Sequence, residues 1–353
     1  MIKNIIGTVD FCESLRGKSA SFLLSMSNTE TANIEGITQA GIPGMLHLTP
    51  TLDAEFNCTG EVRSLDNIAV TPKGVPTPAL LTRAVHMLKP FHTIELVNLG
   101  LEIEPKLNYF KTHSFEIKPS ASIENDAKID AMEIFEKGVE FGQNYIVKSD
   151  YLILGESVPS GTTTAAATAM ALGYDCEDMF SSSFKNNPTN IKKQVIAKAL
   201  ENTKDKVEVF EKLGSVADNM LIFNAGFVLG ANNREFKIVL AGGTQMAAVL
   251  LVINSILNQM DGEIDSSKIA LCTTKWVAED QNSDMESLLE MLDFKIDAYY
   301  SDFDFSLSHH PALKLYDDGE AKEGVGAGAA LMYGILNGLN KENITLKVES
   351  LLG

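Results

Sequence analysis

Three glycine-rich segments combine small residues, hydroxyls and carboxylates in a pattern that suits an anionic ligand. They are residues 155–164, 242–245 and 323–328. We expect each to open a helix, and a helix N-terminus carries unpaired N–H groups and a positive dipole end that bind anions. Two of the segments contain a glutamate, Glu156 and Glu323. A carboxylate beside a phosphate is electrostatically costly unless it holds a ribose hydroxyl or moves a proton, so the combination indicates an enzyme acting on a phosphorylated ribose.

The first segment is the best candidate for an anion site. Gly161 permits close approach of an anion, and Thr162 and Thr163 offer hydroxyls and N–H groups at the helix start. The spacing matches neither the P-loop, which needs Gly-Lys-Ser/Thr, nor the Gly-x-Gly-x-x-Gly dinucleotide motif. A plain strand-to-helix turn capped by threonine is the alternative interpretation.

The other two segments allow two interpretations each. Residues 242–244 fit a phosphate or ribose contact, or a plain tight turn. In the last segment, backbone N–H groups could face a ligand while Glu323 acts as a general base. Alternatively Gly324, Gly326 and Gly328 simply allow tight helix packing.

The remaining polar residues give no metal site. Lys192 and Lys193 lie near the start of a charged helix, where solvated lysines are the ordinary case, although one could reach a phosphate. The adjacent pair His309 and His310 would face different ways in a helix or strand. The cysteines are scattered without zinc spacing, so we expect reduced, buried thiols and neither a metal nor a cofactor.

Composition limits the partners of the protein. The 353 residues are 45% apolar, enough for one large or two ordinary domains with hydrophobic cores. The longest apolar run, residues 246–253, is far shorter than the roughly 20 residues that a membrane span needs, and residues 1–7 are too short for a signal peptide. We therefore expect a cytoplasmic protein. A net charge of −18 argues against a nucleic-acid partner but not against a small phosphorylated ligand.

The pattern of apolar residues predicts an α/β fold. In the amino-terminal part we expect strands at 21–26, 45–48 and 93–99, helices at 79–88 and 129–142, and irregular chain over 100–128. From residue 151 onward we expect strands at 151–154, 236–240, 268–273 and 295–300, and helices at 162–172, 191–213, 220–229, 245–257 and 327–339. Strands alternating with helices predict a buried parallel sheet, whose ligands bind at the carboxyl ends of the strands.

Roughly residues 150–340 resemble the nicotinate-nucleotide–dimethylbenzimidazole phosphoribosyltransferase family of cobamide assembly. The bacterial family has a Gly-Glu-Met-Gly-Ile-Gly-Asn-Thr-Thr stretch, which residues 155–163 match in length, in the leading Gly-Glu and in the closing Thr-Thr. The family's late Glu-Gly-Thr-Gly-Ala resembles residues 323–327, and Lys192 best matches its phosphate-contacting lysine. The amino-terminal 140 residues look like a divergent, archaeal-type branch.

The resemblance implies a reaction and roles for residues. The 5-phosphoribosyl group of nicotinate mononucleotide would move to a benzimidazole-type base, giving α-ribazole 5′-phosphate and nicotinate without a metal. Glu323 would take the azole proton, and Glu156 would lie near the ribose or assist. The implied phosphate and ribose contacts are Gly155, Ser160, Gly161, Thr162, Thr163, Lys192, Gly242, Gly243, Gly324 and Gly326.

The resemblance also implies an architecture. It is a Rossmann-like parallel sheet with helices on both faces, plus a smaller helical domain drawing on the chain ends, usually in a homodimer. We place the large domain at about 20–50 and 90–310 and the smaller one at about 1–18 and 320–353 of a single catalytic unit. A non-catalytic nucleotide-binding or regulatory protein on the same fold is the alternative function. A NAD-dependent oxidoreductase is disfavoured because its glycine motif is missing.

Overall fold

The computed structural model describes residues 1–186 and 188–352, and its centre is an eight-stranded sheet. The strand order is β1-β8-β7-β6-β5-β2-β3-β4, and every neighbouring pair is parallel except β1 with β8. The strands are β1 (Ile2–Ile6), β2 (Ala20–Met26), β3 (Ile94–Asn98), β4 (Lys111–Ser114), β5 (Tyr151–Ser157), β6 (Lys237–Ala241), β7 (Ile269–Thr274) and β8 (Asp297–Ser301).

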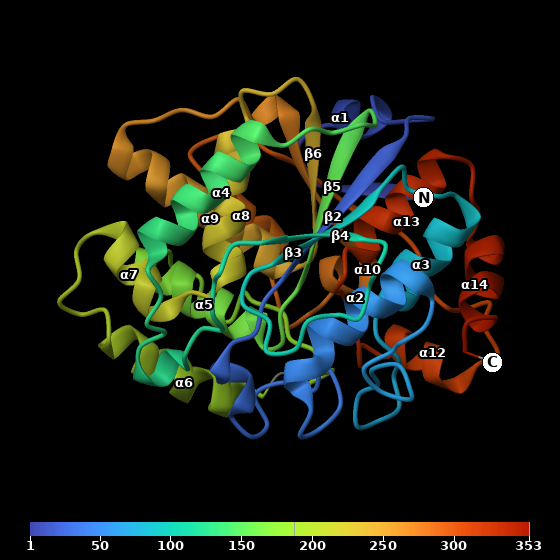
Figure 1. Cartoon of the computed structure of the whole chain (residues 1–353), viewed down its shortest axis with the longest axis horizontal. Coiled ribbons are helices and arrows are strands. Elements are labelled where there is room, and N and C mark those ends of the chain that lie inside the picture. Colours follow the sequence, from blue (N-terminus) through green and yellow to red (C-terminus); the bar gives the residue numbers. More distant parts are fainter. Residues whose placement is uncertain (187, 353) are drawn as a thin grey trace.

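Helices cover both faces of this sheet (Figure 1). One face carries α4 (Ala131–Asn144), α5 (Gly161–Leu172), α6 (Thr189–Glu201), α7 (Val209–Val216), α8 (Asn219–Ala231), α9 (Thr244–Met260) and α11 (Met285–Glu290). The other carries α1 (Asp10–Glu13), α2 (Thr49–Thr59), α3 (Ala79–Leu88), α12 (Pro311–Asp317), α13 (Ala327–Leu336) and α14 (Lys341–Glu349), and the short α10 (Lys275–Ala278) continues directly from β7.

The central strands have no solvated face. On β5, Leu152 and Leu154 join the core beneath α8 and α9, whereas Tyr151 and Ile153 join the core beneath α3 and α13. Side chains alternate along a strand, so a strand buried on both faces reads as a continuous apolar run. The β5 register pairs Ser25 of β2 with Glu156.

The predicted fold class is confirmed. The sheet is parallel except at one edge, helices lie on both faces, and the helical layer with α1, α13 and α14 draws on both chain ends. Figure 1 shows this layer, coloured blue and red, on one side of the sheet, with both termini there. All the cysteines are free and buried, as expected. Within the described residues, no helix is long and apolar enough to cross a membrane.

Four predictions were wrong in detail. Residues 100–128 are not irregular throughout, because they contain β4, which pairs with β3. Residues 45–48 are not a strand, because a 3₁₀ turn at Leu46–Leu48 leads into α2, with proline at the helix start. The predicted helix 191–213 is two helices, because Glu208 and Glu211 form a capping box that starts α7 anew. Strand β5 runs to Ser157, so Gly155 and Glu156 lie on the strand and not in a turn.

Helices α4 and α8 pack with their backbones almost in contact. A Cβ on Gly138 would lie 2.3 Å from the Phe223 oxygen, and one on Gly142 would lie 2.2 Å from the Phe227 oxygen. Gly226 and Gly230 of α8 face α4 equally closely, at 2.3 and 2.2 Å from carbonyl oxygens. Glycines four residues apart lie on the same side of a helix, so each helix presents a smooth stripe to the other.

This contact predicts the effect of one methyl group. Gly138→Ala should lower the free energy of unfolding by about 1–3 kcal/mol, because backbone atoms cannot move aside as a flexible side chain can. Urea unfolding followed by circular dichroism measures this change. The matched control is Gly262→Ala, whose Cβ would come closest to the end of the Leu257 side chain, at 3.0 Å. Equal stability of the two variants would contradict the close packing.

Candidate active site

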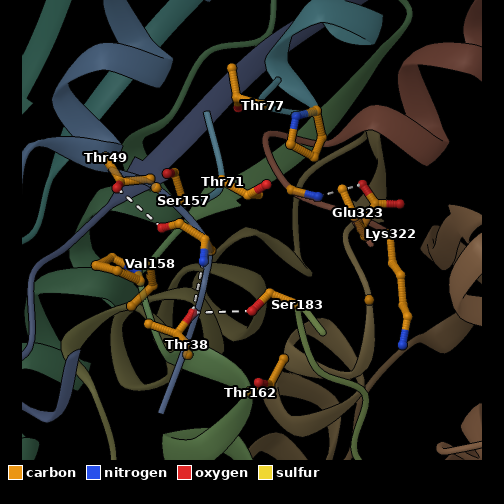
Figure 2. A pocket seen from close by; sticks show the side chains of 18 of the residues that line it. Thr38, Thr49, Thr71, Thr77, Ser157, Val158, Thr162, Ser183, Lys322 and Glu323 are labelled. Atoms are coloured by element: carbon orange, nitrogen blue, oxygen red, sulfur yellow. Dashed lines mark hydrogen bonds between the residues drawn. The ribbon is translucent and has the colours of Figure 1, made fainter. Parts of the chain in front are cut away.

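An open pocket of about 940 Å³ lies at the carboxyl ends of β5, β6 and β7 (Figure 2). It is the edge at which a parallel sheet is expected to bind ligands. All three glycine-rich segments contribute to its wall. The predicted site residues that line it are Glu156, Ser160, Gly161, Thr162, Gly243, Glu323 and Gly324.

Glu323 is held by the backbone at the start of α13. Its Oε1 accepts hydrogen bonds from the N–H groups of Gly324 and Gly328, both at 3.2 Å, and its Oε2 accepts one from Thr274 N–H at 2.8 Å. Burial raises the pKa of Glu323 to about 7, although these hydrogen bonds oppose the rise. The helix start therefore serves the protein's own carboxylate, and these N–H groups are not free to cradle a phosphate.

Glu156 is the second buried carboxyl of the pocket and is 2% exposed. Its pKa is raised to about 8, first by burial and then by the negative charges of Glu323, Asp218 and Asp53. Near neutral pH, Glu156 thus carries a proton while Glu323 is close to its midpoint. Two carboxyls whose pKa values are separated by their surroundings suit complementary acid and base roles.

One end of the pocket suits an anion. The N-termini of α5 and α9 both open onto it, through Gly161 and Thr162 and through Gly243 and Thr244. The hydroxyl of Ser160 lines the same end, is buried, and has no hydrogen-bond partner among the described residues. Ser160 also adopts a left-handed conformation with φ of 60°, a strained geometry that is typical of functional sites.

Two buried lysines lie behind this end. Lys192 is 5% exposed and donates to Thr162 Oγ1 and to the Ser181 carbonyl, both at 3.0 Å. The solvated alternative therefore applies only to Lys193, which pairs with Asp178 at the surface. Burial and the charge of Lys322 lower the pKa of Lys192 to about 7, and Asp280 opposes them.

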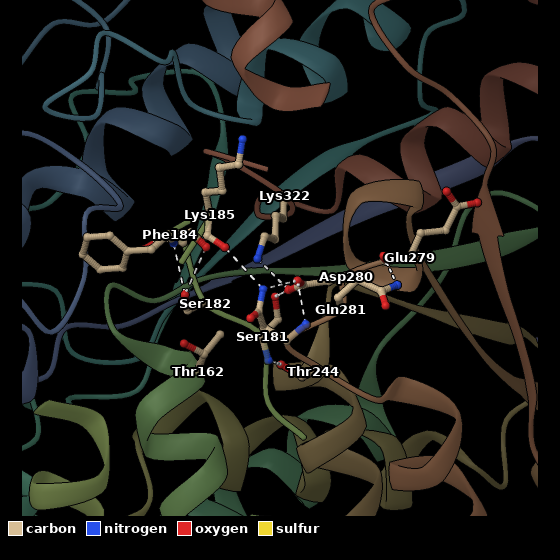
Figure 3. Close-up of polar contacts among 12 residues, drawn as sticks. Thr162, Ser181, Ser182, Phe184, Lys185, Thr244, Glu279, Asp280, Gln281 and Lys322 are labelled. Atoms are coloured by element: carbon tan, nitrogen blue, oxygen red, sulfur yellow. Dashed lines mark hydrogen bonds and ion pairs between the residues drawn. The ribbon is translucent and has the colours of Figure 1, made fainter. Parts of the chain in front are cut away.

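Lys322 forms a buried ion pair with Asp280 at 2.5 Å (Figure 3). The Ser181 hydroxyl donates to the same Asp280 oxygen at 3.0 Å, and the Ser181 carbonyl accepts from Lys192. Ser181 therefore links Lys192 to the Asp280–Lys322 ion pair. Burial raises the pKa of Asp280, but the hydrogen bond and charge of Lys322 and the hydrogen bonds from Asn282 together outweigh it, and the pKa lies below its usual value.

The other predicted residues lie outside the pocket wall. Gly155 and Gly326 meet back to back, where a Cβ on either would lie 3.0 Å from the Phe22 ring, so they serve packing. Gly242 supports the tight-turn interpretation, because its Cβ would lie 2.7 Å from Met246. Thr163 is fully buried, and its hydroxyl has no partner in the described part of the chain.

The pocket also contains residues that the sequence did not single out. They include Asp53, Thr77, Ser181 and Lys322, whereas Ser157 and Gln245 lie within the glycine-rich segments but had been given no role there. Of these, only Lys322 could have been suspected from the sequence, because it directly precedes Glu323. Asp53 lies on α2, which was not expected as a helix, and nothing in its neighbours along the chain marks it as a pocket residue.

The opposite end of the pocket is apolar. Its wall is built by Ala69, Val70, Val75, Pro76 and Pro78. Glu323 lies between the two ends: its Cβ is 3.7 Å from the position of a Cβ on Gly243, and the neighbouring Gly324 faces Pro78. Figure 2 shows Thr77 and Thr162 on opposite sides of the pocket. The site can therefore accept a ligand that is anionic at one end and apolar at the other.

Comparisons with known proteins identify the family and the fold. A family model described as phosphoribosyltransferase matches residues 85–261. The UPF0284 protein of Saccharolobus solfataricus is 36% identical over 358 residues, covering 99% of this chain and 96% of its own. That of Metallosphaera sedula is 34% identical over 353 residues, covering 99% and 97%.

Solved structures share the fold. The nicotinate-nucleotide–dimethylbenzimidazole phosphoribosyltransferase of Thermus thermophilus superimposes with a TM-score of 0.62 at 15% identity, covering 95% of this chain and 84% of its own. A structure of CobT from the same organism gives 0.59 at 15% identity, with 94% and 84% covered.

The raised pKa of Glu156 predicts a pH-dependent cost to folding. A carboxyl with a folded pKa of about 8 contributes stability that is fully present below its unfolded pKa and lost as pH rises through 8. Glu156→Gln should therefore gain about 2–5 kcal/mol over the native chain between pH 5 and pH 8.5. Urea unfolding at both pH values tests this, with Glu61→Gln at the surface as control. A difference that does not grow with pH would contradict the raised pKa.

The ion pair predicts a second stability effect. Asp280→Asn removes the counter-charge of buried Lys322, and breaking such a pair costs about 3–5 kcal/mol. The double variant Asp280→Leu with Lys322→Met should recover most of this loss, because no charge remains unpaired. Thermal unfolding compares the two. A single variant as stable as the double would show that the pair is solvated in solution.

Proposed function

The chain belongs to a phosphoribosyltransferase family that includes the archaeal UPF0284 proteins, and from this we propose that it moves the 5-phosphoribosyl group of nicotinate mononucleotide to a benzimidazole-type base. The products would be α-ribazole 5′-phosphate and nicotinate, for assembly of the nucleotide loop of cobamides. The observation that carries the proposal is a pair of glutamates, Glu156 buried and Glu323 partly buried, between an end of the pocket that suits an anion and an apolar end.

We place the donor nucleotide across the pocket. Its 5′-phosphate would rest on the N-termini of α5 and α9, where Ser160 offers an unpartnered hydroxyl. Lys192, which donates a hydrogen bond to Thr162, would provide the positive charge behind the phosphate. Because its pKa is near 7, Lys192 would gain a proton when the phosphate dianion binds. The acceptor base would lie against the prolines and valines of the apolar end.

The two glutamates would divide the chemistry. The bond between C1′ and the nicotinate nitrogen breaks with its electron pair passing to nicotinate, and the azole nitrogen forms the new bond to C1′. The azole N–H proton passes to Glu323, whose pKa near 7 suits a general base. Glu156, protonated near neutral pH, would donate to a ribose hydroxyl. Before it takes the proton, the Glu323 carboxylate would also stabilise the positive charge that develops at C1′.

Removing Glu323 tests this assignment. Glutamine is a poor replacement, because its amide NH₂ would face the N–H donors that now hold the carboxylate. Glu323→Ala should bind nicotinate mononucleotide within a few-fold of the native affinity, yet turn over about 10²–10⁴-fold more slowly. Added formate should restore part of the rate by supplying a carboxylate to the vacated space.

Nicotinate release followed by chromatography measures turnover, and calorimetry measures binding. Glu279→Ala, a surface carboxylate beside Tyr300, is the control and should keep its rate. A Glu323→Ala enzyme with native turnover would place the base elsewhere. Tight binding of nicotinate mononucleotide by the native chain with no turnover toward any azole would instead favour the non-catalytic alternative. A homodimer stays a prediction, which sedimentation would test.

A further inference from the structure

The apolar end of the pocket contains a buried carboxylate that the proposed reaction does not use. Asp53 lies on α2, is 4% exposed and lines the pocket. Its Oδ1 accepts a hydrogen bond from Thr77 Oγ1 at 2.6 Å, and its Oδ2 accepts one from Ser157 Oγ at 2.7 Å. Both hydroxyls also line the pocket, so the three side chains form one polar site in an apolar wall.

The carboxylate fixes the direction of both hydroxyls. A hydroxyl has a single proton, and an ionised carboxylate can only accept, so each hydroxyl must donate toward Asp53. Burial raises the pKa of Asp53 to about 6 against the opposing effect of the two hydroxyls, and the group is therefore ionised at pH 8. Each hydroxyl then has only lone pairs left for other partners.

The lone pairs of the two hydroxyls are not equally free. Thr77 Oγ1 already accepts from the Ala79 N–H at 3.2 Å. No N–H or O–H group in the described part of the chain donates to Ser157 Oγ. Ser157 therefore offers the pocket a hydrogen-bond acceptor whose polarity is set by Asp53. A ligand without a matching donor would leave this buried acceptor unpaired, which binding sites discriminate against strongly.

We propose that Ser157, oriented by Asp53, selects an acceptor base that carries a hydrogen-bond donor outside its reacting azole ring. A hydroxyl or exocyclic amine on the fused ring meets this requirement, whereas two methyl groups do not. The inference rests on the proposed function for the identity of the site. It adds that the base is recognised by polarity and not only by its apolar surface.

Three matched bases test the proposal at pH 8. 5-Hydroxybenzimidazole supplies a donor, 5-methoxybenzimidazole supplies only an acceptor, and 5,6-dimethylbenzimidazole supplies neither. Calorimetry with the full chain, with and without nicotinate mononucleotide, gives the affinity for each. The native protein should bind the hydroxy base about 10-fold or more tightly than the methoxy base.

Two variants test the role of each residue. In Asp53→Asn, the amide oxygen can accept from Thr77 while its NH₂ donates to Ser157, which frees the serine proton to point into the pocket. The preference for the hydroxy base should then disappear or reverse toward the methoxy base. Ser157→Ala should abolish the preference, and it keeps the test valid if Asp53→Asn does not fold. The control Ser183→Ala, at the other end of the pocket, should keep the preference.

The outcomes separate this inference from the proposed function. A native protein that binds the hydroxy and methoxy bases equally, or a Ser157→Ala variant that still prefers the hydroxy base, overturns the inference. Nicotinate release with every base but no donor preference also overturns it and leaves the proposed function standing. Donor-selective binding without nicotinate release supports the inference and overturns the proposed function.

Discussion

The site depends on the burial of carboxyl groups at the carboxyl edge of the sheet. Asp53, Glu156, Asp218 and Glu323 are withdrawn from water together, and burial raises the pKa of each. Such groups persist in a fold only where hydrogen bonds or protons compensate for the lost hydration. For two of them the compensation comes from helix starts, because Asp218 caps α8 and Glu323 accepts from the N–H groups that open α13. Asp53 is held by two hydroxyls, and Glu156 keeps its proton near neutral pH.

That constraint explains which parts of the site could be predicted from sequence. Glu156, Glu323 and the α5 start could be predicted as pocket residues because each lies near the end of an apolar strand or at a glycine-rich helix start. Asp53 was missed because its position depends on α2, and Thr77 because a proline-rich loop carries no periodicity. Thr77 and Ser157 lie 80 positions apart along the chain, and both donate to Asp53, which no local pattern encodes.

The glycines could likewise be interpreted only in part from the sequence. All three glycine-rich segments reach one pocket, but the sequence left open whether each glycine faces a ligand or a neighbouring backbone. Gly161 and Gly243 line the pocket, while Gly155 and Gly326 press against each other beneath Phe22. The strand order likewise required tertiary information, because the edge strands β1 and β4 are short and half exposed. The alternation of strands and helices in the interior was enough to predict the fold class.

Glu156 and Ser157 are adjacent on β5 but face opposite sides of the sheet, and we propose different roles for them. Glu156 packs toward α9 through Gly242, whereas Ser157 reaches Asp53 on α2, on the opposite side of the sheet. Because successive side chains alternate, a slip of one residue in the pairing of β5 with β2 would exchange the two faces. The pleat of a single strand therefore separates the residue for which we propose a role at the ribose from the residue for which we propose a role in base recognition. Neither residue can change its position along the strand without displacing the other.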